Sequence, residues 1–565
     1  MMVKEAEIQY RFHLLDSLQK VMPNQEPQAL KEEQKHLYGF KDERVSFQLA
    51  YEMEYDGCEI PLQEVELVVQ SELSCQIQIR KVELVPARLP AYHGQMDEHY
   101  LYKEACLCPD LLLPMEGNVL RPAPYQWRSV WFTVNLESIE VSGSVPVDLA
   151  IKKEGKVMWK DRLYIHVQRE SLPEQRLIHT EWFHADCLAD YYQVPVFSEA
   201  HWNIIEHFVD SAVRHGMNML LTPVFTPPLD TKKGGERTTV QLVGVKKEKE
   251  AYVFDFHLLE RWIDMCMRKG IVYIEISHLF TQWGASCAPK IMAWENGEEK
   301  RIFGWDTPAV GEEYRGFLRQ FLPELKEFLK SKGVFEHTYF HISDEPHDEE
   351  KKTYAAAKHC VMDLLEGCKV MDALSSYDLY KEGIVENPIV CNDSIQTFID
   401  AGVERLWTYY CCVQGNKVSN RFLAIPPERT RILGVQLYLY DIRGFLHWGF
   451  NFYNSQYSLS AVNPYLVTDA DGGFPSGDPF VVYPAPNQTA YDSTRLEVFT
   501  EALYDLRALQ KLEEWTDREH VTALIQEGMD HPITFMEYPK DADYIRNLRK
   551  KIYEEMGMLS ERKDE

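Results

Sequence analysis

The sequence has 565 residues, with 60 Lys and Arg against 88 Asp and Glu, which gives a net charge of -28 at pH 7. So acidic a chain repels phosphate backbones and excludes nucleic acid as an expected partner, and 45% hydrophobic residues exclude the composition of a disordered protein. At roughly 100–200 residues per domain, the length allows two to four domains or one large barrel with additions.

The sequence predicts a cytoplasmic protein without a membrane partner. The first twenty residues carry several charges and contain no apolar core of a secretory leader, and no apolar run of roughly 18 residues predicts a membrane span. The 12 cysteines are scattered, which favours reduced core thiols over a disulfide framework.

Residues 1–172 are predicted to form an antiparallel β-sandwich domain. Short runs of alternating apolar and polar residues, such as Val45–Tyr51 and Trp127–Val134, are typical of half-buried strands. Before them, the spacing within Ile8–Gln34 predicts a short helix packed on the sandwich.

From residue 173 to 515 the pattern changes to short apolar strands alternating with amphipathic helices, which predicts a (β/α)₈ barrel of the TIM type. Pro426-Pro427 should break or restart the last of the inner helices, and residues 516–565 are predicted to be a charged helical extension. The expected strands are Leu177–His184, Asn218–Phe225, Ile271–Ser277, His337–Ser343, Lys369–Ser375, Ile389–Asn392, Arg405–Cys411 and Gly444–Phe452. The expected helices are Ser198–His215, Phe256–Arg268, Glu312–Lys332, Glu349–Glu366, Arg421–Tyr440 and Ser493–Leu512.

The fourth expected strand runs directly into two acids, Asp344 and Glu345, followed by Pro346. Active sites of such barrels lie at the carboxyl ends of the strands, and glycosidic hydrolysis needs a proton donor and a second group that stabilises charge at the anomeric carbon. Two carboxyl groups can supply both. Neighbouring residues reach one ligand only where the strand frays or bulges, and adjacent acids suit a mechanism in which Asp344 orients a 2-acetamido group while Glu345 acts as general acid/base.

Two other interpretations of this segment remain open. Ser343 or Asp344 followed by Glu345-Pro346 is also a good start signal for the next helix. His341, Asp344, Glu345 and His347 could bind a metal, but no second cluster at ligand spacing supports this, so we expect neither a metal nor a cofactor.

Aromatic and polar residues gather at the ends of the other expected strands. Sugar rings stack on aromatic faces, so two or three of these rings should bind substrate, although core packing explains any single ring better. Residues 469–478 match a calcium-binding loop only loosely and are interpreted as a flexible loop at the active site. The candidate substrate-binding residues are Trp182, His184, His278, Trp283, His341, Tyr377, Asn392, Trp407, Tyr409, Tyr410, Trp448, Asn451 and Asp478.

Six segments make the chain resemble glycoside hydrolase family 123, whose catalytic domain is also known as domain of unknown function 4091. The resemblance extends over most of Leu177–Leu512, and the run Gly477-Asp478-Pro479 departs from the Gly-Asp-Gly arrangement that is common in the family. The segments are Glu181–Cys187, Ser277–Ala285, Ser343–Pro346, Trp407–Tyr410, Leu446–Phe452 and Asp478–Pro484.

The resemblance implies a retaining exo-β-N-acetylgalactosaminidase that uses substrate-assisted catalysis. It assigns Asp344 to the acetamido group and an oxazolinium intermediate, and Glu345 to proton transfer. The expected substrate is a small oligosaccharide or glycoside. The alternatives are a non-catalytic carbohydrate-binding barrel, and a glycosidase for sugars without the acetamido group, in which Asp344 would be the nucleophile.

Overall fold

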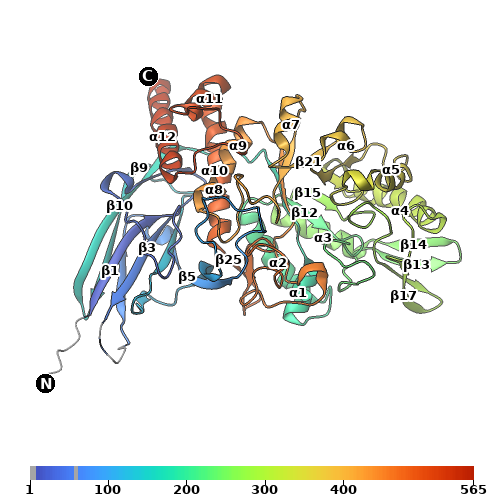
Figure 1. Ribbon diagram of the computed structural model, residues 1–565, viewed down its shortest axis with the longest axis horizontal. Helices are drawn as coiled ribbons and strands as arrows, with labels where there is room; N and C mark the ends of the chain where they lie inside the picture. Colours follow the sequence, from blue (N-terminus) through green and yellow to red (C-terminus); the bar gives the residue numbers. More distant parts are fainter. Residues whose placement is uncertain (1–7, 56, 58–61, 565) are drawn as a thin grey trace.

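A computed structural model describes residues 8–55, 57 and 62–564 (Figure 1). A sheet-rich N-terminal region lies at one end of the elongated molecule, and a parallel sheet surrounded by helices makes up most of the rest. The fold is therefore mixed α/β in the order that the sequence predicts. Within the described residues, no helix has the length and apolar character needed to cross a membrane.

The N-terminal region consists of two five-stranded sheets that share one apolar core. Phe47 and Phe132 stack at 4.5 Å on one sheet, and Val147 and Ile165 face them from the other. The first sheet has the order β1 (Gln9–Asp16), β3 (Arg44–Glu54), β8 (Arg128–Asn135), β5 (Ile77–Ala87) and β6 (Cys106–Pro114). The second has the order β2 (His36–Lys41), β10 (Lys156–Ser171), β9 (Gly143–Lys153), β4 (Val65–Gln70) and β7 (Val119–Leu120).

Two details of this region differ from the sequence prediction. The segment Ile8–Gln34, expected to hold a short helix, begins with strand β1, which pairs with β3 along its whole length, and ends in a 3₁₀ helix of three residues, Glu32–Gln34. Pairing with a buried strand satisfies the backbone of residues 9–16 and overrides their helical spacing. The β2–β10 pair is parallel, whereas every other strand pair in the two sheets is antiparallel.

Nine short parallel strands form a nearly closed barrel. All eight expected strands are present, and the fifth is divided by Met371 into β19, which pairs with β18, and β20, which pairs with β21. Met371 itself donates a backbone hydrogen bond to Phe340 O at 3.0 Å, which keeps the two halves side by side. The strands in chain order are β11 (Ile178–Glu181), β12 (Met219–Thr222), β15 (Tyr273–Ile276), β18 (Thr338–Phe340), β19 (Lys369–Val370), β20 (Asp372–Leu374), β21 (Pro388–Cys391), β22 (Trp407–Tyr409) and β23 (Gly444–His447).

Helices follow the barrel strands, and those between β20 and β23 have only five to seven residues. The predicted break at the proline pair is confirmed, because α8 begins at Pro427. The helices are α1 (Ala185–Tyr192), α2 (Glu199–Arg214), α3 (His257–Lys269), α4 (Glu312–Ser331), α5 (Lys351–His359), α6 (Tyr377–Lys381), α7 (Ile395–Asp400), α8 (Pro427–Arg431), α9 (Leu433–Leu439) and α10 (Thr494–Trp515).

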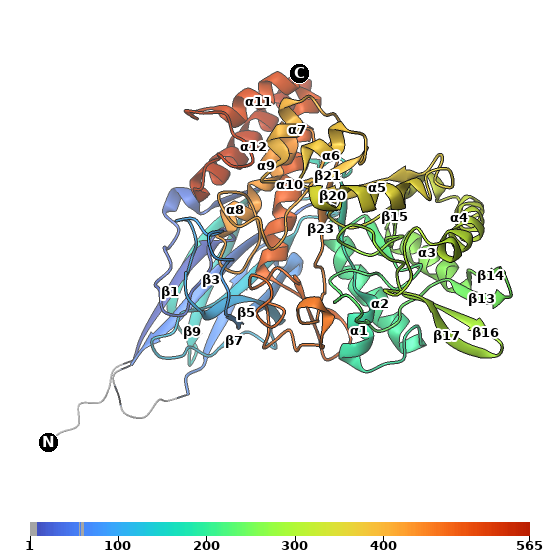
Figure 2. The same cartoon turned by 45° about the vertical axis from the view of Figure 1, so that its right-hand side comes forward.

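Helix α10 lies between the barrel and the N-terminal sheets and contacts both (Figure 2). Ser493 caps its first turn by accepting a hydrogen bond from Leu496 N. Val498 packs on the outer face of the first sheet with Val82 and Trp131. Almost every residue of α10 up to Leu512 is buried, since both sides of the helix are covered.

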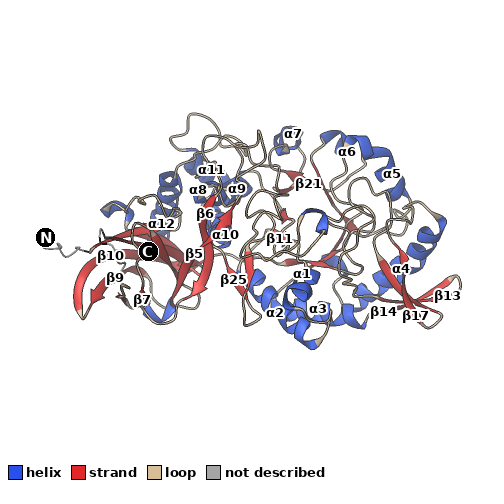
Figure 3. Ribbon diagram, turned by 60° about the horizontal axis from the view of Figure 1, so that its bottom comes forward, coloured by secondary structure: helices blue, strands red, loops and turns tan. Residues whose placement is uncertain are grey.

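Small sheets are inserted into the connections that follow barrel strands. A four-stranded sheet of β13 (Gly244–Glu248), β14 (Ala251–Asp255), β16 (Ile291–Glu295) and β17 (Glu298–Phe303) projects at the end of the molecule opposite the N-terminal region (Figure 3). A hairpin of β24 (Val482–Pro484) and β25 (Ala490–Asp492) precedes α10. The sequence analysis did not predict these strands.

The C-terminal extension is helical, as predicted, and consists of α11 (Arg518–Gln526) and α12 (Ala542–Asp564). It is not a free charged tail: Ile552 and Met556 are buried, and α12 contacts β2, β10 and α10. Cys58 lies outside the described residues, and the other eleven cysteines are free thiols.

Candidate active site

The acid pair lies just beyond the end of β18. Residues 341–343 continue the strand as buried chain, and Asp344 and Glu345 are the first residues with partly exposed surface. Glu345 has a left-handed backbone, with φ 40°, which costs a residue other than glycine about 1–3 kcal/mol. This turn ends the alternation of the strand, so the two acids are not forced onto opposite faces.

Segments from two neighbouring strands contact the acid pair. The backbone N–H of Trp283, in the loop after β15, donates to Asp344 O at 3.2 Å. The hydroxyl of Tyr409, the last residue of β22, donates a short hydrogen bond to Glu345 Oε1. The backbone of one acid and the side chain of the other are thus fixed by different parts of the barrel.

Both carboxyl groups hold a proton more strongly than a free acid. Burial and the nearby charge of Glu345 raise the pKa of Asp344 well above its ordinary value. Burial also raises the pKa of Glu345, against the opposing effect of the hydrogen bond from Tyr409. In the part of the chain that the structure describes, neither acid forms an ion pair, so one of them can keep a proton to donate.

A charged histidine lies behind the pair. His341 Nε2 bonds Glu275 Oε1 at 2.8 Å and Nδ1 bonds Asp372 Oδ1 at 3.2 Å, so both ring nitrogens face carboxylates. Burial disfavours the imidazolium, but these two bonds outweigh it and raise the pKa of His341 to about 10. Its positive charge lowers the pKa of Asp344 and so favours the ionised form of that acid.

His278 and Trp182 cover this charged histidine. The ring of His278 stacks on His341 at 4.4 Å, and Trp182 meets His278 edge-on at 5.2 Å. Burial, followed by the charge of His341, keeps the pKa of His278 well below its ordinary value. His278 is therefore neutral, and its buried Nδ1 has no hydrogen-bond partner among the described residues.

Trp448 and Asp478 form another part of the site. Trp448 Nε1 donates to Asp478 Oδ2 at 2.8 Å, and the half-buried indole packs between Phe452 and Phe474. The charge of Asp478 contributes to the raised pKa of Glu345, so this carboxylate lies near the acid pair. A half-buried indole beside a fixed carboxylate offers a sugar both an apolar face and a hydrogen-bond acceptor.

The N-terminal region fixes the loop that carries Asp478. Arg88, at the end of β5, bonds both carboxylate oxygens of the buried Asp469, and Tyr92 donates to Gly473 O at 2.7 Å. The sequence analysis interprets residues 469–478 as flexible. In the structure this loop is held by side chains from the N-terminal region.

Three polar candidates hold the barrel loops together rather than facing open surface. His184 accepts from Arg237 at one ring nitrogen and bonds Trp448 O with the other, while Asn451 bonds both the N–H and the carbonyl of His184. Asn392 donates to Ser419 O at 2.8 Å, and its buried Oδ1 is without a partner among the described residues.

Trp407, Tyr410 and Tyr377 lie away from the acid pair. Trp407 is the first residue of β22 and packs on Tyr339 at 5.6 Å, so it lies about 7 Å below Tyr409 along the strand, near the opposite end of the barrel. Gly444 makes room for this indole, because a Cβ there would lie 2.0 Å from it.

Tyr410 faces outward, since Tyr409 faces inward, and it packs on Phe445 under the helices. Tyr377 begins α6 and packs edge-on against Phe398 of α7 at 5.1 Å.

Sequence reasoning missed Glu275 and Asp230. Glu275 lies within a buried strand and accepts hydrogen bonds from Trp182 Nε1 at 2.8 Å and Thr180 Oγ1 at 2.5 Å, and an acid inside an otherwise apolar run was a visible signal. Burial raises the pKa of Asp230 to about 6. The negative charge of Asp230 contributes to the raised pKa of Asp344. Nothing in the sequence near Asp230 distinguishes it from an ordinary loop acid.

The clusters that could hold a metal have competing partners. His278, His341 and Asp372 place ligand atoms within 4.8 Å of one another, but His341 already bonds two carboxylates. In the second cluster, His215, Asp492 and Glu497, arginine side chains occupy both acids.

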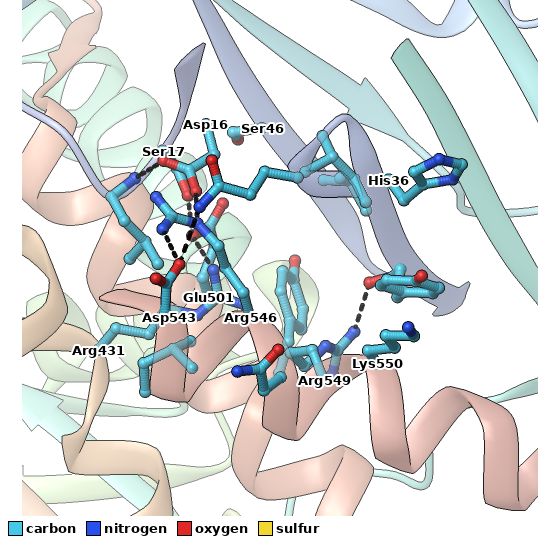
Figure 4. A pocket seen from close by; sticks show the side chains of 18 of the residues that line it. Asp16, Ser17, His36, Ser46, Arg431, Glu501, Asp543, Arg546, Arg549 and Lys550 are labelled. Atoms are coloured by element: carbon cyan, nitrogen blue, oxygen red, sulfur yellow. Dashed lines mark hydrogen bonds and ion pairs between the residues drawn. The ribbon is translucent and has the colours of Figure 1, made fainter. Parts of the chain in front are cut away.

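A cavity of about 290 Å³ lies far from the acid pair in the fold, between the N-terminal sheets and α12 (Figure 4). The charges around it are paired with one another: Arg546 bonds Asp16 and Asp543, and Arg431 bonds Glu501. Its lining contains none of the candidate catalytic or substrate-binding residues.

Comparison with known proteins identifies the class of protein as glycoside hydrolases. The model of the glycoside hydrolase 123 catalytic domain matches residues 182–512, more than half of the chain. The chain therefore belongs to glycoside hydrolase family 123, and this membership makes it a glycosidase.

A solved structure of a family 123 glycoside hydrolase from Clostridium perfringens covers 98% of this chain and 98% of its own, at 14% identity and a TM-score of 0.73, so the two share a fold. A family 5 xyloglucanase from Bacteroides ovatus aligns over 84% of this chain and 99% of its own at 7% identity, with a TM-score of 0.28 that is too low to support any inference. No curated protein matches the sequence.

Proposed function

We propose that this glycosidase is a retaining exo-β-N-acetylgalactosaminidase that acts by substrate-assisted catalysis. The observation that carries the proposal is the pair of adjacent carboxyl groups on one turn at the barrel mouth, with pKa values that stay raised although His341 and His347 lower them. In retaining enzymes whose second acid attacks the sugar, the two carboxyls stand about 5–5.5 Å apart across the scissile bond. Adjacent acids suit a reaction in which the substrate supplies its own nucleophile.

In the first step Glu345 donates its proton to the glycosidic oxygen as the bond from that oxygen to C1 breaks. The carbonyl oxygen of the 2-acetamido group forms the new bond to C1 from the opposite face, which gives an oxazolinium ion. Asp344 accepts a hydrogen bond from the N–H of the acetamido group and stabilises the positive charge of the oxazolinium ion. In the second step Glu345 takes a proton from water, water oxygen bonds C1, and the ring opens with retained configuration.

The mechanism needs one proton shared between the two acids before the reaction, and the raised pKa values of both acids are consistent with it. The imidazolium of His341 favours an ionised Asp344, and an acetamido N–H bound to Asp344 would favour it further. Burial alone favours the proton on Asp344, so we assign it to Glu345 only in the substrate complex, where the acetamido N–H is bound to Asp344 and Tyr409 donates a hydrogen bond to Glu345. His341 acts on the reaction only through Asp344 and is a positioning residue.

The substrate that fits this site is a small oligosaccharide or glycoside with a terminal N-acetylgalactosamine. Trp182, His278 and Trp448 would surround the sugar, and Asp478 would bind one of its hydroxyls. The Clostridium perfringens enzyme of the same fold is described as hydrolysing glycolipid glycans, so a glycolipid headgroup is one source to test.

A series of aryl N-acylgalactosaminides with zero to three fluorines on the acyl group tests the mechanism. Fluorine weakens the carbonyl oxygen as a nucleophile, so kcat/KM should fall steeply along the series, in the range of 10²-fold or more at a cost of about 2.8 kcal/mol. A matched 2-fluorogalactoside should leave the enzyme unlabelled.

A flat response across the series together with a covalent label on Asp344 would show that Asp344 attacks the sugar directly. Sugar binding without hydrolysis of any member would instead establish the non-catalytic carbohydrate-binding alternative. Both outcomes are read from the same preparation by steady-state kinetics and intact-protein mass spectrometry.

A further inference from the structure

Two neighbouring cysteines lie just beyond the end of β22. Cys411 is buried and Cys412 is partly buried, both are free thiols, and their sulfur atoms lie 3.9 Å apart. Tyr409, which donates a hydrogen bond to Glu345, stands only two residues before Cys411. A change in the backbone at the two cysteines would therefore act close to the hydroxyl that contacts the candidate proton donor.

The surroundings of the pair give the two thiols different roles. Cys411 Sγ donates to Gln414 Oε1 at 3.1 Å, and the backbone N–H of Cys411 donates to the same oxygen at 2.9 Å. The hydrogen bond with Cys412, and then burial, raise the pKa of Cys411 well above its ordinary value, so Cys411 keeps its proton. Cys412 has a partly exposed side chain and can meet a reagent that arrives from solvent.

The pair lies beside the candidate active site. The charges of Glu345 and Asp478 both contribute to the raised pKa of Cys411, which places this sulfur near the two carboxyl groups. Cys412 packs against the apolar cluster that contains Cys411 and Tyr409. The proposed mechanism uses neither thiol, so the two sulfurs are free to react without taking part in glycoside hydrolysis.

We propose that Cys411 and Cys412 are a reversible modification site, at which a small-molecule disulfide such as oxidised glutathione joins the two sulfurs and lowers the activity of the enzyme. In the first step the thiolate of Cys412 attacks one sulfur of the oxidant, and the other half of the oxidant leaves as a thiolate. In the second step Cys411 Sγ bonds to Cys412 Sγ, and the second half of the oxidant leaves with the proton of Cys411. The two cysteines are oxidised by two electrons, and the oxidant is reduced to two thiols.

A disulfide between neighbouring residues requires the backbone to twist. Consecutive Cα atoms are about 3.8 Å apart, whereas disulfides usually join Cα atoms about 4.4–6.8 Å apart, so the bond between Cys411 and Cys412 is strained. Tyr409 belongs to the same short segment, and a twist there moves its hydroxyl away from Glu345. Strained disulfides are reduced easily, so a dithiol reagent should reverse the modification.

Peptide mapping by mass spectrometry and steady-state kinetics on one preparation test the inference. After treatment of the wild type with oxidised glutathione, the peptide that contains Cys411 and Cys412 should have lost the mass of two hydrogen atoms. The kcat/KM should fall about tenfold, as for the loss of the hydrogen bond from Tyr409, and dithiothreitol should restore it. In Tyr409→Phe the same oxidation should cost little further activity, because the hydroxyl is already absent.

Three variants serve as controls. Cys411→Ala cannot close the bond and should stop at a mixed disulfide between Cys412 and glutathione. Cys412→Ala, at the less buried position, should resist the oxidant and serves the same purpose if Cys411→Ala does not fold. Cys75→Ala removes an exposed thiol of the N-terminal region and should respond to the oxidant as the wild type does.

Two results would overturn the inference. One is a wild type that accumulates glutathione adducts without a bond between Cys411 and Cys412. The other is a complete bond between them with unchanged kcat/KM. If the reduced enzyme hydrolysed no glycoside, the proposed function would be wrong instead, and peptide mapping would still show whether the two sulfurs join.

Discussion

Two groups of carboxyl side chains, at the barrel mouth and where α10 meets the N-terminal sheets, differ in their neighbours. At that junction Arg80 bonds Asp492 and Glu497, and Arg495 bonds Asp110. Burial opposes ionisation there, yet the arginines hold the pKa of Glu497 at about 2. At the mouth Asp344 and Glu345 are only partly buried, but no arginine is bonded to them, and removal from water raises their pKa values.

The difference shows that burial alone does not make an acid reactive. Glu497 is paired with a guanidinium, stays ionised and holds two layers of the fold together, whereas acids without such a partner can keep a proton that they can transfer. The two kinds of acid are therefore separated by their neighbours, and substitutions that change those neighbours should have effects of different kinds.

The largest effect is expected from Glu345→Gln, which removes the transferable proton and keeps the shape of the side chain. For a glycoside with a poor leaving group, kcat should fall about 10²–10⁴-fold, with an unchanged unfolding midpoint. Glu349→Gln, four residues further on and exposed, is the matched control and should keep full activity. Steady-state kinetics and a urea titration on both variants decide the matter; full activity in Glu345→Gln would assign the proton donor elsewhere.

Arg80→Met should damage the fold instead of the chemistry. It leaves Asp492 and Glu497 buried without one of their counter-charges, which should lower the free energy of unfolding by about 3–5 kcal/mol. Arg162→Met breaks a pair with Asp148 of similar geometry, but both side chains are about half exposed, so about 0–1 kcal/mol is expected. Denaturant titrations compare the two, and folded Arg80→Met should keep its specific activity. Equal losses in both variants would contradict the role given to burial.

Glu501, on the wall of the cavity in Figure 4, tests whether an arginine partner is enough to keep a buried acid ionised. It pairs with Arg431 and still has a raised pKa. Burial outweighs Arg431 and raises its pKa to about 7. Between the unfolded pKa of about 4.5 and about 7, the folded state keeps a proton that the unfolded state has lost, so stability should fall as pH rises, by up to about 1.4 kcal/mol per pH unit. Glu501→Gln cannot ionise and should flatten this part of the curve of unfolding free energy against pH. A slope identical to that of the wild type would exclude Glu501 as its source.

The smallest effect is expected from Tyr409→Phe. Its hydroxyl stabilises the ionised form of Glu345, so its loss should raise the pKa of Glu345 and move the basic limb of the kcat/KM profile to higher pH. The rate at the optimum should fall about tenfold, as for one lost hydrogen bond to a charged group. Tyr410→Phe, one residue along and facing outward, should leave the profile in place. A limb that moved to lower pH would contradict the proposed role of Tyr409.

The sequence was sufficient to predict the features that depend on local pattern. The alternation of strands and helices predicted a parallel barrel after a sheet-rich region, and the run into Asp344-Glu345-Pro346 marked the end of β18. It could not predict the left-handed backbone at Glu345, because that conformation is enforced by contacts with other loops.

Residues within strands were harder to place than residues at strand ends. Trp407 and Tyr409 both face into the barrel, but Trp407 begins β22 and Tyr409 ends it, so they lie near opposite ends of the barrel. The sequence of these three residues does not show which of the two side chains lies at the end that carries the acid pair. Glu275 and Asp230 were missed because their roles depend on residues far away in the sequence, His341 and Tyr457.

The hydrogen bonds of Arg88 and Tyr92 to the loop that carries Asp478 limit which N-terminal domains could be combined with this barrel. Arg88 and Tyr92 of the N-terminal region bond the barrel loop that carries Asp478, so replacing that region would remove two contacts that fix the loop. A chimera that joined this barrel to an unrelated β-domain would keep Asp344 and Glu345 but would lose the guanidinium that fixes Asp469. If Asp478 binds the sugar as proposed, substrate choice would depend partly on a region that supplies neither acid of the proposed catalytic pair.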